Sequence, residues 1–341
     1  MSATMTKSQL AIYPLRFTVE VQTPLKLTRP YGAQLRGALY EALLRSSCTT
    51  QQARSSGISS FHKDCLCPVH ALMTPLRDET LTRGVKGGRD QPRPYVIRPP
   101  QEVPPVYYPG QHFTFELLLF GQSIDLLPYL IQAIPQLEQA GLGASPGEHQ
   151  NKRGRFRIRR LESYHPFTGA HAVLYTENRI NWNAQLKAVT STDISQRAAQ
   201  LPSDRITIHF LSPLRLIADG QLVHEHQLSF AVLVHRLFKR LRDLEEAYSS
   251  GAQPAFLPEH HPYLKQAEQI ACQHIHTGWY DDFSYSRRRG ASSPIGGIIG
   301  YATFTGELQP FRELLTWGEL CHVGRSCVKG NGHYRLMPPP D

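Results

Sequence analysis

The chain has 341 residues, of which 40% are hydrophobic, and it carries a formal net charge of +9 at pH 7. This length suffices for two domains that each bury a core. The charge favours a polyanionic partner over an acidic protein or a small-molecule substrate. No segment approaches the length of a transmembrane helix, and the N-terminus lacks the regions of a signal peptide, so we expect a cytoplasmic protein with no membrane partner. Six cysteines do not suggest a disulfide scaffold in a chain of this size.

The first half of the chain predicts alternating strands and helices. Residues 13–21 alternate between apolar and polar, as strands do, and residues 33–45 carry apolar side chains at helical spacing. Residues 46–94 are rich in Ser, Gly, Arg and Pro, which predicts an irregular insertion. Two strands, a helix kinked at Pro135 and a last strand are then expected at 95–98, 113–120, 124–140 and 155–161. This order of elements is that of a ferredoxin-like unit.

The second half predicts the same order of elements after a stretch of patchy structure. Its expected elements are a strand, a helix, a strand-and-turn region, a helix and a strand, at 205–211, 228–248, 283–304, 309–320 and 333–337. We therefore predict an α+β chain of two tandem ferredoxin-like, or RRM-like, domains, the first with an irregular insertion. The predicted boundaries are 1–165 for the first domain, 166–203 for a linker and 204–341 for the second domain.

Two short patterns recur in the two halves and favour a duplicated domain. Pro24-Leu-Lys-Leu ends the first strand of one half, and Pro213-Leu-Arg-Leu ends that of the other. Gly154 and Gly332 each begin a basic segment that leads into a last strand. Two matches in the same order indicate duplication more strongly than one does, while chance similarity of short strands is the alternative.

Arginine occurs at every second position where the first half ends. These residues are Arg153, Arg155, Arg157 and Arg159. On a strand they point to one face, while Phe156 and Ile158 point to the other. Four like charges repel each other unless a polyanion lies across them, and an RNA backbone is such a polyanion. We predict phosphate contacts here; an edge strand protected from aggregation by its charges is the alternative.

A glycine-rich basic loop lies between the last predicted helix and the last strand. Glycines let a backbone approach a polyanion closely, and the loop adds cationic side chains. We predict that it binds a sugar-phosphate backbone; a tight turn is the alternative. The residues expected to contact RNA are Gly324, Arg325, Lys329, Gly330 and Gly332.

A second basic cluster follows the aromatic residues Phe283 and Tyr285. Its members are Arg287, Arg288 and Arg289. Arginine and tyrosine together can hold a phosphate and stack on a base, which predicts a further RNA contact. Solvated arginines on a surface loop are the alternative.

Cysteine and histidine side chains suggest two more sites. The four residues Cys48, Cys65, Cys67 and His70 could hold a structural zinc ion, although Cys-x-Cys is not the usual knuckle spacing, and free thiols are the alternative. His322 lies where the last helix meets the glycine-rich loop. It could reach a scissile phosphate, or bind the carbonyl groups of the helix end.

Four motifs carry a resemblance to a known family. They are Pro24-Leu-Lys-Leu27, Leu35-Arg-Gly-Ala-Leu-Tyr-Glu-Ala-Leu43, Gly141-Leu-Gly143 before Arg153-Gly-Arg-Phe156, and Gly318-Glu-Leu-Cys-His-Val-Gly-Arg325 with Gly330-Asn-Gly332. Together they resemble the CRISPR-associated repeat-RNA endoribonucleases of the RAMP superfamily, the sixth Cas family. The resemblance covers nearly the whole chain and implies tandem ferredoxin-like domains.

The resemblance also implies an activity. Precursor crRNA would be cleaved without a metal cofactor, by attack of a 2′-hydroxyl on the adjacent phosphate, and CRISPR repeat RNA and other Cas effector subunits would be partners. Many members carry a histidine in or beside the first helix, but no histidine occurs between Met1 and Phe61 here. The candidate catalytic residues are Tyr31, Arg36 and His322. Two alternatives are a non-catalytic RAMP subunit that binds crRNA and a general RNA-binding protein outside CRISPR.

Overall fold

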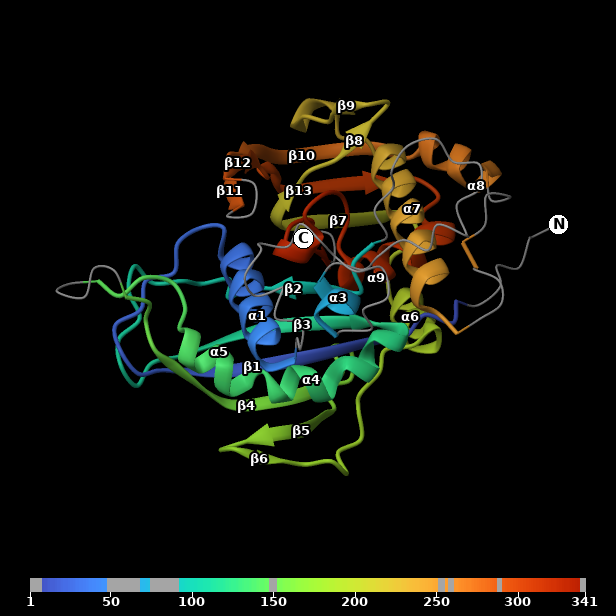
Figure 1. Ribbon diagram of the computed structural model, residues 1–341. Helices are drawn as coiled ribbons and strands as arrows, with labels where there is room; N and C mark the ends of the chain where they lie inside the picture. The colour runs from blue at the N-terminus through green and yellow to red at the C-terminus, as the bar shows by residue number, and fades with distance from the viewer. Residues whose placement is uncertain are drawn as a thin grey trace.

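The computed structural model describes residues 8–47, 68–73, 92–146, 152–250, 255–256, 261–286 and 290–337. These residues form two main antiparallel sheets and the helices that pack on them (Figure 1). The shorter elements outside the two main sheets and their covering helices are α3 (Pro68–Met73), α6 (Ser191–Ala199), α8 (His261–Gln266), β8 (Ile217–Ala218), β9 (Gln221–Leu222), β11 (Phe283–Ser286) and β12 (Ala291–Pro294). None of the helices among the described residues has the length and apolar character needed to cross a membrane.

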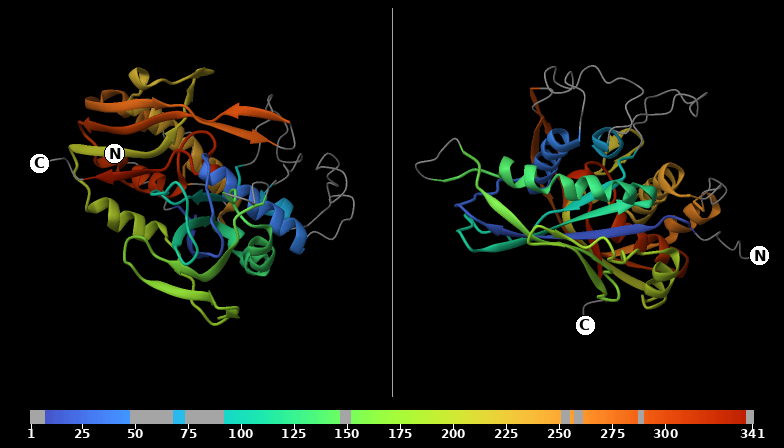
Figure 2. Two further views of the ribbon diagram at one scale, coloured as in Figure 1. Left: turned by 90° about the vertical axis from the view of Figure 1, so that its left-hand side faces the viewer. Right: turned by 60° about the horizontal axis from the view of Figure 1, so that its bottom comes forward.

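The first sheet has the strand order β2-β3-β1-β4-β5-β6. Its strands are β1 (Ile12–Val21), β2 (Tyr95–Arg98), β3 (His112–Phe120), β4 (Phe156–Tyr164), β5 (His171–Thr176) and β6 (Arg179–Ile180). The helices α1 (Tyr31–Ser47), α4 (Leu127–Gln132) and α5 (Ile134–Ala140) lie on one side of this sheet (Figure 2, right). On the opposite side, apolar residues such as Val96 and Phe120 pack toward the second half, and polar residues such as Glu116 line the rest, because alternate residues of a strand point to opposite faces.

The second sheet has the strand order β10-β13-β7-β14. Its strands are β7 (Arg205–Leu214), β10 (Ala271–Tyr280), β13 (Gly297–Thr305) and β14 (Tyr334–Met337), and its main helices are α7 (Phe230–Tyr248) and α9 (Arg312–Cys321). In the first half, β1 and β3 are central and are flanked by β2 and β4. In the second half, β7 and β13 are central and are flanked by β10 and β14. This is the ferredoxin-like arrangement, so the predicted fold class of two tandem units is confirmed.

Several elements differ from those expected. The predicted helix 124–140 is a 3₁₀ turn followed by α4 and α5, which meet at Ala133, because Pro135 cannot donate a backbone hydrogen bond in a continuous helix. The segment 166–203 contains β5, β6 and α6, and β5 extends the first sheet by pairing with β4. The strand β10 was not predicted, because most of its side chains are exposed and show no apolar alternation.

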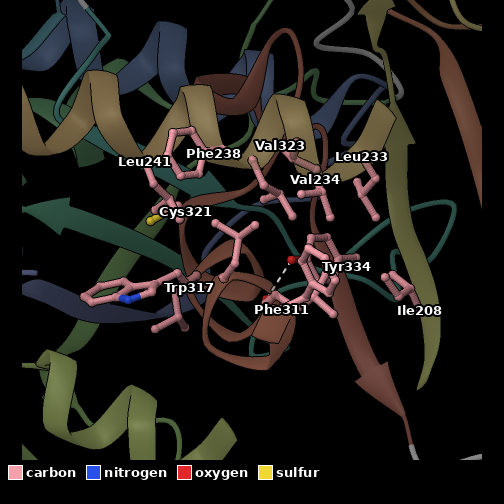
Figure 3. Close-up of a cluster of buried hydrophobic side chains, with 14 of the residues drawn as sticks. Ile208, Leu233, Val234, Phe238, Leu241, Phe311, Trp317, Cys321, Val323 and Tyr334 are labelled. Carbon is pink, nitrogen blue, oxygen red and sulfur yellow. Dashed lines mark hydrogen bonds between the residues drawn. The ribbon is translucent and has the colours of Figure 1, made fainter. Parts of the chain in front are cut away.

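The hydrophobic core of the second half lies between its sheet and the helices α7 and α9 (Figure 3). Tyr334 lies inside it and donates a hydrogen bond from its hydroxyl to the Leu315 carbonyl at 2.7 Å. Side chains from the first half also enter this core, among them Ile12, Val96 and Phe120. The two sheets are therefore held together by apolar packing as well as by the chain connection.

Candidate nucleic-acid interface

The N-terminus of α1 is packed directly against the glycine-rich loop of the second half. A Cβ atom on Gly32 would lie 2.0 Å from the Lys329 carbonyl oxygen, so only glycine allows the two backbones to come this close. On the other side of the loop, a Cβ atom on Gly330 would lie 2.8 Å from a ring carbon of Pro99. We call this contact between α1 and the 3₁₀ turn η7 (Cys327–Lys329) the α1–loop junction.

Aromatic and cationic side chains gather at the α1–loop junction. The Arg29 guanidinium donates a hydrogen bond to the Tyr280 hydroxyl, and it lies 4.9 Å from the Tyr280 ring centroid and 5.7 Å from that of Tyr31. Hydrogen bonding to Tyr31 raises the pKa of the Arg29 guanidinium, and hydrogen bonding to Tyr280 is the second cause of this rise. A permanent positive charge is therefore held between two phenol groups, one from the start of α1 and one from the end of β10.

Lys329 adds a second positive charge to the junction. Its ammonium donates a hydrogen bond to the Ser284 hydroxyl at 2.9 Å, which ties the glycine-rich loop to β11. The hairpin β11–β12 lies beside α1 in two views (Figures 1 and 2), and its exposed side chains include Phe283 and Tyr285. Two cations, two phenols and a hairpin with exposed aromatic rings are the groups that bind a phosphate and stack on bases.

His322 is enclosed behind the loop. Its side chain is 0% exposed, and its Nδ1–H donates to the Asn331 carbonyl at 3.2 Å while its Nε2 accepts from Arg98 Nε at 3.3 Å. Its ring stacks on His333 with the centroids 4.8 Å apart. Burial, together with the nearby Arg98 guanidinium, holds the pKa of His322 well below its ordinary value. The neutral imidazole thus fastens the loop to the helix end, and no face of it is open to a ligand.

Arg36 does not point to the junction. Its guanidinium donates to the Tyr95 hydroxyl at 3.1 Å and to the Met73 carbonyl at 3.4 Å, beneath α1. The three candidate catalytic residues therefore occupy three different environments, and of these only Tyr31 lies at the junction.

The arginines of the segment 153–159 differ in their surroundings. Arg153 pairs with Glu41 at 3.2 Å, and Arg159 pairs with Glu20. Arg155 and Arg157 are exposed, while Phe156 and Ile158 between them are buried. The expected alternation of the two faces is present, and the exposed pair is open to solvent.

The remaining loop residues flank the junction. Arg325 is exposed, and its backbone N–H donates to the Arg215 carbonyl at 2.9 Å. Gly324 and Gly332 have φ values of 90° and 70°, which other residues rarely adopt. A Cβ atom on Gly332 would lie 1.8 Å from the Val323 carbonyl oxygen. These two glycines shape the loop by close backbone contact.

Some predicted residues lie outside the described part of the chain. These are Arg287, Arg288, Arg289, Cys48, Cys65 and Cys67, and the side chain of His70. Within the residues that are described, no group of three His, Cys, Asp or Glu side chains is arranged to hold a metal ion.

Arg29, Tyr280 and Ser284 are the junction residues that the sequence analysis did not select, although Arg29 stands two residues before the candidate Tyr31. Tyr280 ends a strand without apolar alternation, and Ser284 is a common residue type with no pattern around it. The one signal in the sequence is their position shortly before the basic cluster 287–289. Their role becomes visible only when the folded chain brings β10 and β11 to α1.

Two family models match the chain. The AF_1859_N model, described as an N-terminal domain, matches residues 10–189, which is more than half of the chain. The model for the CRISPR-associated endoribonuclease Cas6 matches residues 208–334. An uncharacterized protein of Archaeoglobus fulgidus is 24% identical over 308 residues, which cover 89% of this chain and 91% of that protein.

Solved structures share the fold at low identity. The Cas6 (TTHB231) product complex of Thermus thermophilus matches with a TM-score of 0.52 and 13% identity, over 95% of this chain and 99% of that one. A partial Cas6-RT-Cas1–Cas2 complex matches with a TM-score of 0.57 and 14% identity, and 98% of this chain corresponds to 47% of that longer chain. The chain therefore belongs to the family of the AF_1859_N model, and its residues 208–334 resemble CRISPR-associated Cas6 endoribonucleases.

Proposed function

We propose that this protein binds CRISPR repeat RNA and cleaves precursor crRNA at the α1–loop junction, without a metal cofactor. The observation that carries the proposal is the junction itself. Arg29 and Lys329 belong to opposite halves of the chain, and the backbone segments that carry them are in direct contact. The phenol of Tyr31 lies beside Arg29. The match to the Cas6 model and the likeness to a Cas6 product complex support RNA as the ligand.

The proposed reaction is an internal transfer at one phosphate. The 2′-oxygen forms a bond to phosphorus and loses its proton, while the bond from phosphorus to the 5′-oxygen breaks and that oxygen gains a proton. The products carry a 2′,3′-cyclic phosphate and a 5′-hydroxyl. Negative charge builds up on the phosphorane oxygens, so Arg29 and Lys329 stabilise the transition state more than the ground state.

Tyr31 is the residue that we assign to the reacting hydroxyl. A phenol can orient the 2′-hydroxyl by a hydrogen bond, but it is a poor base near neutral pH, so we expect slow cleavage that depends on RNA alignment. We assign structural roles to His322 and Arg36, because His322 is enclosed and Arg36 is hydrogen-bonded beneath α1. His322 holds the loop in place, and Arg36 anchors α1.

The RNA would continue from the junction over nearby basic surfaces. The exposed Arg155 and Arg157, with Arg325 and the cluster 287–289, are assigned to phosphate contacts, which position RNA without reading its sequence. Arg153 and Arg159 are already paired with carboxylates and contribute less.

Other Cas proteins are proposed as partners after cleavage. Structural zinc at Cys48, Cys65, Cys67 and His70 stays a prediction.

A single-turnover assay tests the cleavage. Labelled repeat RNA from the CRISPR array of the same genome is incubated with excess protein in EDTA, and the 3′ end of the product is analysed. We expect one cut that leaves a cyclic phosphate. A 3′-hydroxyl product, or cleavage that stops in EDTA, would contradict the mechanism.

The alternative is a non-catalytic RAMP subunit that binds crRNA. It is favoured by the enclosure of His322 and by the absence of histidine from the sequence of α1. Tight binding of the same RNA with no product after long incubation would establish it. The cleavage assay therefore separates the two functions with one substrate.

A further inference from the structure

A row of four side chains crosses the open face of the second sheet. Tyr301 on β13 is paired in register with His276 on β10 and with His209 on β7, and His209 is paired with Arg335 on β14. The four residues stand on adjacent strands, which are about 4.8 Å apart. We call this set the cross-strand row.

The row lies on the face turned away from the core. On the central strands the neighbours Ala302, Phe304, Ile208 and Phe210 are buried in the core. The row residues alternate with them, so they point to the opposite face. The Tyr301 side chain is 44% exposed, and His276 and Arg335 are also exposed. Large polar rings therefore stand in solvent on the two central strands and on β10.

The rings contact one another as a connected surface. The centroids of His276 and Tyr301 are 5.1 Å apart with an interplanar angle of 38°, and those of His209 and Tyr301 are 6.2 Å apart at 87°. On the same face, two residues from His209 and Tyr301, the buried hydroxyls of Thr207 and Thr303 are hydrogen-bonded to each other at 2.8 Å. The three rings thus form a connected surface through one tilted and one edge-on contact.

Charge on this face suits a polyanion. The outward residues of these strands include Arg205 and the row residue Arg335, but no aspartate or glutamate is among the residues described on β7, β10, β13 and β14. The open face of the first sheet differs, because Glu116 and Glu162 line the groove of about 980 Å³ between the halves and pair there with arginines. Arg335 lines one edge of that groove. The row therefore offers stacking surfaces and positive charge together.

The row is also continuous with the α1–loop junction. Tyr280, which binds Arg29, lies on the same strand and the same face as His276, four residues further along β10. At about 3.3 Å per residue this separation is roughly 13 Å. A strand of RNA leaving the junction can therefore reach the row along β10 without crossing an edge of the sheet.

We propose that the cross-strand row is a stacking platform for unpaired RNA bases, a second binding site beside the cleavage centre. Exposed rings on the central strands of a four-stranded sheet stack on bases in other single-strand-binding sheets, because every base has a flat π face. Tyr301 and His209 supply the stacking surfaces, and Arg335 supplies a phosphate contact. The proposal rests on the proposed function, since it concerns a further part of the same RNA.

The test measures the affinity of the full-length protein for an unstructured probe, a fluorescein-labelled 12-mer of uridylate, and for the repeat RNA. We expect Tyr301→Ala to weaken binding of the 12-mer by roughly five- to 150-fold, and Tyr301→Phe to retain it. Arg335→Ala should lower the slope of log affinity against log salt by about 0.7, whereas Tyr301→Ala leaves that slope unchanged. Tyr129→Ala is the matched control, because Tyr129 is 40% exposed and lies on α4.

His209→Ala and His276→Ala keep the test valid if Tyr301→Ala fails to fold. If the variants at Tyr301, His209 and His276 bind the 12-mer within twofold of the wild-type affinity, the row is not a stacking platform. The same result is expected if a protein partner, and not RNA, covers this face. Loss of binding in these variants together with no cleavage by the wild type would uphold the platform and refute the proposed catalysis. A wild-type protein that binds neither RNA would refute both.

Discussion

At the scale of single residues, the junction separates groups that are open to solvent from groups that hold the scaffold. Arg29 and Tyr31 are partly open to solvent, whereas His322 is fully enclosed. A histidine beside a glycine-rich loop is a natural candidate for proton transfer when only the sequence is known. Its two hydrogen bonds, to Asn331 and from Arg98, instead make it part of the support of the loop.

The buried state of His322 predicts a pH dependence of stability. Its pKa is lowered in the folded protein, so the unfolded chain binds the proton more readily. The contribution to stability is therefore complete above the unfolded pKa of about 6.5, and it is lost as the pH falls below that value. The expected slope is at most about 1.4 kcal/mol per pH unit for this group.

Urea unfolding at pH 7.5, 6.5 and 5.5 measures this effect. The variant His322→Gln lacks the titrating group, so its free energy of unfolding should fall less steeply between pH 6.5 and 5.5 than that of the wild type. Equal slopes for the two proteins would show that His322 does not titrate below its ordinary range.

At the scale of elements, close backbone contact places α1 on the loop. Gly32 and Gly37 are both in α1, but a Cβ atom on Gly32 would strike the Lys329 carbonyl, whereas one on Gly37 would meet nothing within 4 Å. The helix thus offers a substitution that should break the junction and one that should not.

The two glycines give a matched pair of variants. We expect Gly32→Ala to lower the free energy of unfolding by about 1–3 kcal/mol and to slow cleavage, because the loop must move away from α1. Gly37→Ala should raise stability by up to about 1 kcal/mol and leave cleavage unchanged, since alanine is the better helix former. Thermal or urea unfolding and single-turnover rates check both. Similar behaviour of the two variants would contradict the close contact.

The segment entering β4 gives a second prediction at this scale. Arg155→Ala combined with Arg157→Ala should weaken binding of repeat RNA and lower its salt dependence by about one to two units of the log–log slope. Arg179→Ala is the control, because Arg179 is an exposed arginine on β6 at the far edge of the sheet. An unchanged affinity and slope in the double variant would remove this segment from the RNA path.

At the scale of the whole molecule, much of the fold could be predicted from the sequence. Strong periodicity marked β1, β3, α1 and α7, because each buries one face against a core. The strand β10 could not be predicted because it is an exposed edge strand without apolar alternation. The extension of the first sheet by β5 and β6 depends on strand pairing, which no local sequence pattern indicates.

The candidate site was less predictable than the fold, because it is assembled from distant segments. Arg29, Tyr280 and Lys329 come from the bend just before α1, the end of β10 and the glycine-rich loop. The loop was recognised from its glycines and charges, which are local features. The contact of Arg29 with Tyr280 and the enclosure of His322 follow from how the halves pack, which a sequence read residue by residue does not show.

The central claim, that the α1–loop junction is one cleavage centre, is tested most directly by a double-mutant cycle. Single-turnover rates at saturating protein are measured for the wild type, Tyr31→Phe, Lys329→Ala and the double variant, with the exposed Lys265→Ala as control. We predict that each single change slows cleavage by about 10²-fold, that the double variant is little slower than either, and that Lys265→Ala is unaffected. Wild-type rates in both single variants would place the chemistry elsewhere and contradict the claim.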